Sequence, residues 1–148
     1  MVRPRSWRTP TGCVACSRGR GSCPTTQSAD LLTLGARLRP LREQGVLVIG
    51  SGFMTHGLPF IDWSRPEAVP GWSRDFDLWA VDALARGDVD ELAAFRTRAP
   101  GMPYAHPTTE HFVPLFITMG AATDPTVAPT TVIDGWMYGL SRRSFQVA

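Results

Sequence analysis

The sequence contains no lysine, only three histidines, and no apolar run long enough to cross a membrane. A membrane span needs about 18 consecutive apolar residues, and the N-terminus also lacks the apolar block of a secretory signal. All three cysteines (Cys13, Cys16 and Cys23) fall near the N-terminus. An odd number of cysteines in a chain without an export signal argues against a disulfide framework. We therefore expect a cytoplasmic protein that does not enter a membrane.

The first 28 residues differ in composition from the rest of the chain. Residues 1–28 hold five arginines and no acid, whereas residues 29–148 hold ten arginines and thirteen acids. With several prolines and no apolar period, residues 1–28 are predicted to form a disordered leader ahead of one folded domain, residues 29–148. A structural zinc site needs four ligands, and the nearest histidine lies 33 residues beyond Cys23. Arginine-rich arms can bind phosphates, but Trp7 is the only aromatic residue among these arginines, so we expect no nucleic-acid partner.

Helical periodicity followed by a continuous apolar run predicts an α/β domain. Leucines recur at helical spacing from Leu31 to Leu41, with Ser28 as the expected N-cap and Gly45 as the stop. Residues 46–49 then form an apolar run without alternation, which is typical of a strand buried on both faces in a parallel sheet. We therefore expect a central, mostly parallel sheet flanked by helices.

The rest of the domain carries shorter helical and strand patterns. Residues 73–87 and 88–95 place aromatic and aliphatic side chains on one face, which indicates helices packed against the core. Pro107 suits the opening of another helix, which we expect to run to Gly120. Towards the C-terminus, tight turns separate runs of strand-forming residues. The predicted strands are 130–133, 136–140 and 144–147.

The three histidines are the candidate functional residues. His56 follows the predicted strand on the glycine-rich stretch GSGFMTHG, and open α/β sheets bind ligands at this end of their strands, which favours a functional role. His111 falls in the first turn of the predicted helix, where the helix dipole would keep its imidazole neutral and available to a metal ion. His106, just before Pro107, also suits a cap or a surface position. The spacing of His106 and His111 matches no metalloprotease helix, so periodicity gives a candidate metal site and no reaction.

Four stretches of the sequence carry a more specific pattern: GVLVIGSGFMTHGLPF, WSRDFDLWAVDAL, APGMPYAHPTTEHFVPLFITMGAA and GLSRRSFQV. A Gly-Ser-Gly turn precedes Thr-His, and Pro-Thr-x-Glu-His-x-x-Pro-Leu comes about fifty residues later. Across residues 29–148 this pattern resembles the C-terminal half of the class III extradiol ring-cleavage dioxygenases, in the branch that includes the DOPA dioxygenases. The resemblance implies an α/β fold, a nonheme Fe(II) or Zn(II) ion, and opening of a catecholic ring with O2.

Position by position, the resemblance gives His111 as a metal ligand and places His56 at the metal, either as a second ligand or as the catalytic acid or base that handles catechol protons. His106 falls where family members can carry other residues such as Asn, which implies a substrate contact or no role. Glu110 is expected to be an acid at a helix N-terminus and not the carboxylate of a two-histidine, one-carboxylate site. Neutral imidazoles hold Fe(II) while leaving open positions, and a histidine with a pKa of about 7 can exchange protons with a substrate.

The resemblance also implies that the enzyme is incomplete in this chain. Family members carry further site histidines in an N-terminal half, and residues 1–28 match nothing there, so the chain is expected to be truncated relative to the family. One alternative is an inactive remnant or metal-binding pseudoenzyme, and another is an arginine-tailed nucleic-acid binder. Half a sheet would leave exposed edges, which predicts self-association into a homo-oligomer.

Overall fold

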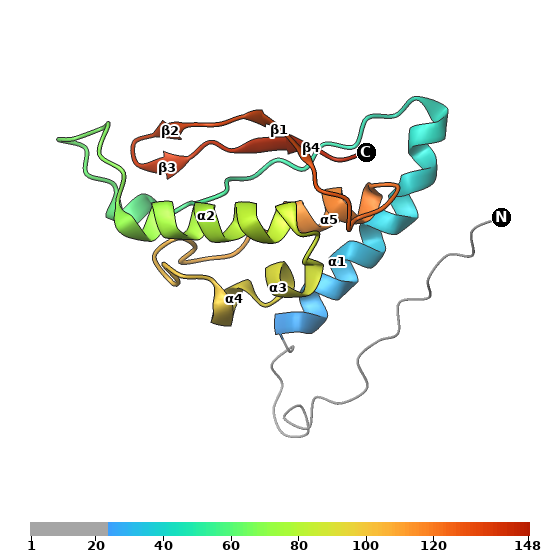
Figure 1. Ribbon diagram of the computed structural model, residues 1–148, viewed down its shortest axis with the longest axis horizontal. Helices are drawn as coiled ribbons and strands as arrows, with labels where there is room; N and C mark the ends of the chain where they lie inside the picture. The colour runs from blue at the N-terminus through green and yellow to red at the C-terminus, as the bar shows by residue number, and fades with distance from the viewer. Residues whose placement is uncertain (1–23) are drawn as a thin grey trace, which may run out of the picture.

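A computed structural model describes residues 24–148 of the chain as a mixed arrangement of helices and short strands (Figure 1). The greater part of the predicted leader and all three cysteines lie outside these residues. The helices are α1 (Pro24–Leu38), η1 (Arg39–Gln44), η2 (Leu58–Phe60), α2 (Gly71–Ala85), α3 (Val89–Ala93), α4 (Phe95–Arg98) and α5 (Pro114–Ala121). The strands are β1 (Thr130–Ile133), β2 (Trp136–Met137), β3 (Leu140–Ser141) and β4 (Ser144–Gln146).

The core lies between the helices and is built around four phenylalanines. Phe76 of α2, Phe95 of α4, Phe112 and Phe116 are all buried and meet at ring-centroid distances of 4.8 to 6.2 Å. Tilted and edge-to-face contacts of this kind stabilise a core beyond the area they bury. Helix α5 packs closely on α1. Gly120 permits this contact, because a Cβ at this position would collide with the main chain of α1.

Two of the predicted helices are confirmed. Residues 73–87 were expected to be helical, and α2 spans Gly71–Ala85 with Phe76 and Leu84 on its buried face. The next helix, α3, begins after Asp88, whose side chain accepts a hydrogen bond of 3.0 Å from the backbone N–H of Glu91. This N-cap satisfies one of the amides that a helix start leaves unpaired.

Helix α1 spans Pro24–Leu38, so the predicted N-cap at Ser28 is wrong. Ser28 lies inside the helix, where its buried hydroxyl donates to the carbonyl of Ala93 at 3.4 Å. A serine inside a helix can bond to another element, which sequence patterns do not reveal.

The helix expected from Pro107 begins later than predicted, because α5 starts at Pro114. A proline inside a helix lacks the N–H for the main-chain ladder, and its ring clashes with the carbonyl four residues earlier. The chain therefore passes through turns from residue 108 to residue 113 and enters the helix at Pro114 itself. His111 consequently lies ahead of the helix, and the helix-dipole argument for a neutral His111 does not apply.

The strands form two small antiparallel sheets, and the expected central parallel sheet is not present among residues 24–148. Strand β1 pairs with β4, and β2 pairs with β3. Residues 46–49, predicted to be a buried strand, form no strand, and most of their side chains are exposed. A strand needs a hydrogen-bonded neighbour, and the described part of the chain places none beside this segment.

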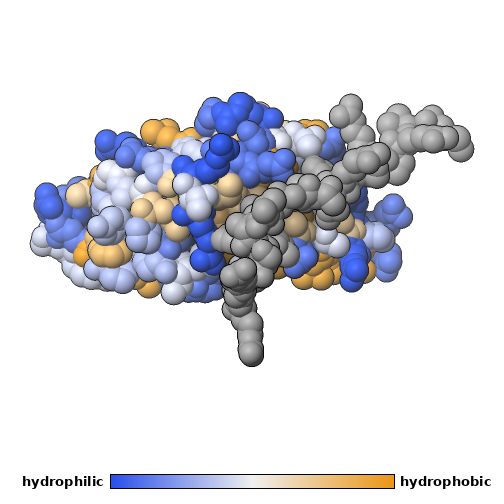
Figure 2. All heavy atoms as spheres, turned by 90° about the horizontal axis from the view of Figure 1, so that it is seen from below, coloured by the Kyte–Doolittle hydropathy of each residue, from blue (hydrophilic) through white to orange (hydrophobic). Residues whose placement is uncertain are grey.

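Figure 1 shows the β1–β4 ribbon on one side of α2 and α5, with the segment from residue 46 to residue 57 running between the ribbon and these helices. Figure 2 shows apolar patches on the lower face, separated by hydrophilic side chains. Within residues 24–148, no helix has the length and apolar character to span a bilayer.

Candidate metal centre

His56 lies on a loop that passes close to the residues just before α5. The backbone N–H of Phe53 donates to the carbonyl of His111 at 2.9 Å, and the N–H of His56 donates to the carbonyl of Ala105 at 2.7 Å. Gly52 allows this approach, because a Cβ there would collide with the carbonyl oxygen of His111. Two segments about fifty residues apart in the chain are thereby held side by side.

This pairing brings the two predicted metal ligands together. The imidazole rings of His56 and His111 stack with their centroids 3.4 Å apart and their planes inclined by 21°. The ring of Phe53 flanks both, at 5.6 Å from His56 and 6.2 Å from His111. The two histidines therefore share one site with an apolar wall.

The carboxylate of Glu110 belongs to the same cluster. One ligand atom from each of His56, Glu110 and His111 lies within 4.8 Å of the others. Two nitrogens that each lie about 2.1 Å from a metal ion can be at most about 4.2 Å apart, so small side-chain movements would suffice to hold one ion. Two imidazoles and one carboxylate are also the donor set of nonheme Fe(II) sites. The residues present fit a divalent metal ion.

The electrostatics of the cluster favour metal-binding protonation states. Partial burial lowers the pKa of His56, and the neighbouring His111 lowers it further, while Glu110 acts in the opposite direction. The pKa of Glu110 is lowered mainly by a hydrogen bond of 2.6 Å from the hydroxyl of Thr108. A neutral imidazole and an ionised carboxylate are the forms that coordinate a cation.

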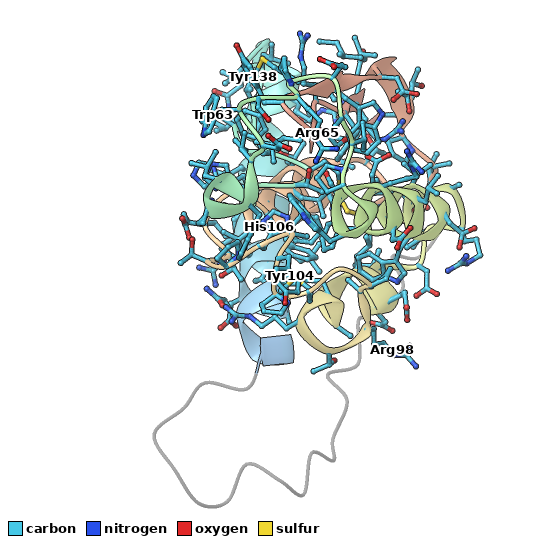
Figure 3. All side chains as sticks on the ribbon, turned by 90° about the vertical axis from the view of Figure 1, so that its left-hand side faces the viewer. Trp63, Arg65, Arg98, Tyr104, His106 and Tyr138 are labelled. Atoms are coloured by element: carbon cyan, nitrogen blue, oxygen red, sulfur yellow. The ribbon has the colours of Figure 1, made fainter. Side chains whose placement is uncertain are left out.

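His106, the predicted substrate contact, lies in the core. Its side chain is 1% exposed, and its Nε2 lies 2.9 Å from the carbonyl of Met54. Phe76 and Phe112 pack against the ring at 4.9 and 5.1 Å, and Figure 3 shows His106 in the interior. A ring enclosed in this way cannot touch a substrate, so the expectation does not fit the geometry. His106 instead fixes the loop that carries His56.

A buried polar network supports the same loop from the other side. The hydroxyl of Thr55, next to His56, lies 2.8 Å from the hydroxyl of Ser73 and accepts a bond of 2.8 Å from the backbone N–H of Ser141. The hydroxyl of Ser141 donates to Asp77 at 2.6 Å, and Arg143 donates two hydrogen bonds to the same carboxylate. This ion pair raises the pKa of Arg143. Helix α2 and strand β3 are thus tied to the loop.

The sequence did not predict Glu110 as a ligand, whereas the structure brings its carboxylate close to both histidines. Glu110 was expected to be a helix-terminal acid, but it lies in a turn beside His111. The position of Glu110 directly before His111, in the stretch TTEHF, is the sequence feature that could have indicated a carboxylate at the site. The supporting residues Thr55 and Asp77 gave no signal, because their partners come from elements remote in the chain.

The fold and the cluster define a mixed helix–strand chain with a histidine and carboxylate site suited to a nonheme metal. The family model described as "Catalytic LigB subunit of aromatic ring-opening dioxygenase" matches residues 20–138. The chain belongs to this family, which confirms the resemblance seen in the sequence.

Curated relatives agree with the family assignment. The chain is 42% identical over 98 residues to a 4,5-DOPA dioxygenase extradiol of Beta vulgaris, covering 64% of this chain and 35% of the relative. It is 38% identical over 109 residues to one of Portulaca grandiflora, covering 71% of this chain and 39% of the relative. The chain therefore spans little more than a third of the length of these relatives.

A solved structure shows the same arrangement. The crystal structure of an uncharacterized protein from Escherichia coli K12 superposes with a TM-score of 0.71 at 27% sequence identity. The superposition covers 82% of this chain and 50% of that chain. The described fold therefore resembles about half of the Escherichia coli protein.

Proposed function

We propose that this chain is part of a metal-dependent extradiol dioxygenase, which breaks a carbon–carbon bond of a catecholic ring and inserts both atoms of O2. The observation that carries the proposal is the cluster of His56, Glu110 and His111 in a chain of the ring-opening dioxygenase family. The relatives named 4,5-DOPA dioxygenase extradiol support a DOPA-like catechol as the substrate class.

The side chains of the cluster have distinct roles in this proposal. His56, His111 and Glu110 would hold Fe(II) or Zn(II), and the ion would supply Lewis-acid activation and, as iron, reactivity towards O2. If His56 does not coordinate the ion, its neutral ring would instead accept a proton from a catechol hydroxyl, and its lowered pKa favours the neutral form. The ring of Phe53 offers an apolar surface to the aromatic substrate.

We infer that the chain alone binds metal without efficient turnover. The side chain of Glu110 is 62% exposed and that of His111 is 36% exposed, so the cluster is open to water. Ring-opening chemistry is favoured by a site from which water is excluded. The same openness supports the second candidate function, a metal-binding protein without catalytic activity.

Metal binding is tested by calorimetric titration of the purified chain with Zn(II). We expect His56→Ala and His111→Ala to weaken the affinity at least tenfold, and Glu110→Gln to weaken it less. Glu43→Gln is the matched control, because it removes one exposed carboxylate of η1 that does not belong to the cluster. Unchanged affinity in both histidine variants would remove these residues from the metal site.

Turnover is tested separately with Fe(II), air and DOPA, by following the absorbance of the yellow ring-opened product. We expect no useful rate from the chain alone. Sustained product formation that His56→Ala abolishes would show that the chain is a complete enzyme. Metal binding without turnover, even when the matching remainder of a relative is supplied, would favour the non-catalytic candidate.

A further inference from the structure

A groove with a volume of about 710 Å³ runs between residues 45–54 and strand β4. Its walls are two extended stretches of chain, and its floor includes residues of α5. Figure 1 shows the first stretch passing between the β1–β4 ribbon and the helices. Two facing stretches of chain suit an extended peptide between them, and the groove reaches the metal cluster, because His111 is among its lining residues.

The first wall of the groove has a free backbone edge. Val46 donates its N–H to the carbonyl of Leu41, and Phe53 donates to the carbonyl of His111. Between them, residues 47–52 make no backbone hydrogen bond to any residue that the structure describes. Six consecutive peptide groups without hydrogen-bond partners offer a backbone edge to which another strand can pair.

The side chains of this wall are also uncovered on one face. Leu47 is 79% exposed and Ile49 is 76% exposed, and alternate residues of an extended chain point to the same face. Gly50 seats the segment on α5, because a Cβ there would collide with Thr118. Apolar side chains that all face solvent at an unpaired edge are typical of an interaction surface.

The opposite wall has a free edge as well. Strand β4 pairs with β1 through Thr130↔Gln146 and Thr131↔Phe145, and no other strand of the described residues pairs with β4. Residues 144–147 line the groove. An inserted strand would thus find a backbone edge on either side.

We propose that this groove is a strand-insertion site for an extended apolar strand from the part of the family fold that this chain does not match. The chain's fold superposes on only half of the larger Escherichia coli structure, so the other half of that body needs a surface on this half. The groove combines unpaired peptide groups with exposed apolar side chains, which is the surface that β-augmentation requires. The inference does not depend on metal binding.

Hydrogen exchange tests the proposal with the full chain. The added partner is the portion of the Beta vulgaris relative outside its matched 35%, expressed as a separate polypeptide, and a second arm uses overlapping synthetic peptides that tile this portion. We expect the amides of residues 47–52 to exchange at least tenfold more slowly with the partner or with one of the peptides. The amides of residues 63–65 serve as an internal control and should not change.

Variants identify the surface. Ile49→Asp and Leu47→Asp should abolish the protection, while Leu78→Asp, which changes an exposed leucine of α2 outside the groove, should leave it intact. Circular dichroism checks that each variant is folded. Absence of protection in both arms, or equal protection in Ile49→Asp, overturns the proposal. Protection that rises with the concentration of the chain alone shows a second copy in the groove, which also overturns it.

Discussion

Acidification is expected to destabilise the fold through the buried His106. Its Nε2 must carry the hydrogen, because the carbonyl of Met54 at 2.9 Å can only accept. The remaining ring nitrogen, Nδ1, is buried and has no hydrogen-bond partner in the described part of the chain. A second proton would have to enter at Nδ1, where nothing accepts it, and burial accordingly lowers the pKa of His106 to about 4.

The sign of the effect follows from proton binding. In the unfolded chain the pKa of a histidine is about 6.5, so between pH 6.5 and pH 4 the unfolded state binds more protons than the folded state at His106. The free energy of unfolding therefore falls as the pH falls through this window. A difference of about 2.5 pKa units corresponds to about 3 kcal/mol, all of which is present above pH 6.5.

The assay compares urea unfolding of the natural chain and His106→Gln at intervals from pH 7.5 to pH 4. Glutamine keeps a donor near the position of Nε2 but does not titrate in this range. Contributions from the other histidines and the carboxylates are common to both proteins and cancel in the difference. We expect the natural chain to lose about 3 kcal/mol more than the variant. Parallel pH profiles would refute the assignment of His106 as the acid-sensitive group.

Three further predictions concern the support of the site. Arg143→Met should destabilise the chain by about 3 kcal/mol in urea unfolding at pH 7, because the carboxylate of Asp77 would stay buried without its ionic partner. Gly52→Ala should weaken Zn(II) binding about tenfold in calorimetric titration, because the new Cβ displaces His111. Asp88→Ala should cost about 1 kcal/mol in thermal unfolding through loss of the α3 N-cap.

Each of these predictions has a control or a contradicting outcome. A loss below about 1 kcal/mol in Arg143→Met would show that the ion pair is solvated in solution. Gly71→Ala introduces a Cβ that meets no neighbouring atom, so it should leave the Zn(II) affinity unchanged. Asp88→Ser keeps a capping oxygen and should retain most of the stability, whereas equal losses in both Asp88 variants would contradict the capping role.

Sequence patterns within one segment were sufficient to predict strand β1 and the start of helix α3. The predicted strand 130–133 coincides with β1, and Asp88, the first residue of the predicted helix 88–95, caps α3. The cap joins Asp88 to Glu91 three residues later, and β1 consists entirely of β-branched residues, which favour a strand. Capping and β-propensity depend on the segment itself, so a single sequence reveals them.

Long-range pairing could not be predicted in the same way. The apolar run at residues 46–49 indicates a segment that is stable when both faces are covered, but it does not name the neighbours that would cover them. Glu110 illustrates the same limit at the site, because only the fold shows which atoms its carboxylate meets. The pairing of His56 with His111 came from the family resemblance and not from their spacing. The burial of His106 required the arrangement of the aromatic core.

The two main-chain hydrogen bonds that join the loop of His56 to the residues before α5 involve no side-chain atoms. Peptide groups are the same whichever amino acid carries them, so these two hydrogen bonds tolerate substitution at most of the positions they join. Mutations accumulating in the surrounding helices would erode stability before they separated the two imidazoles. In divergent members of this lineage, the relative placement of the histidines should therefore outlast recognisable sequence similarity around them.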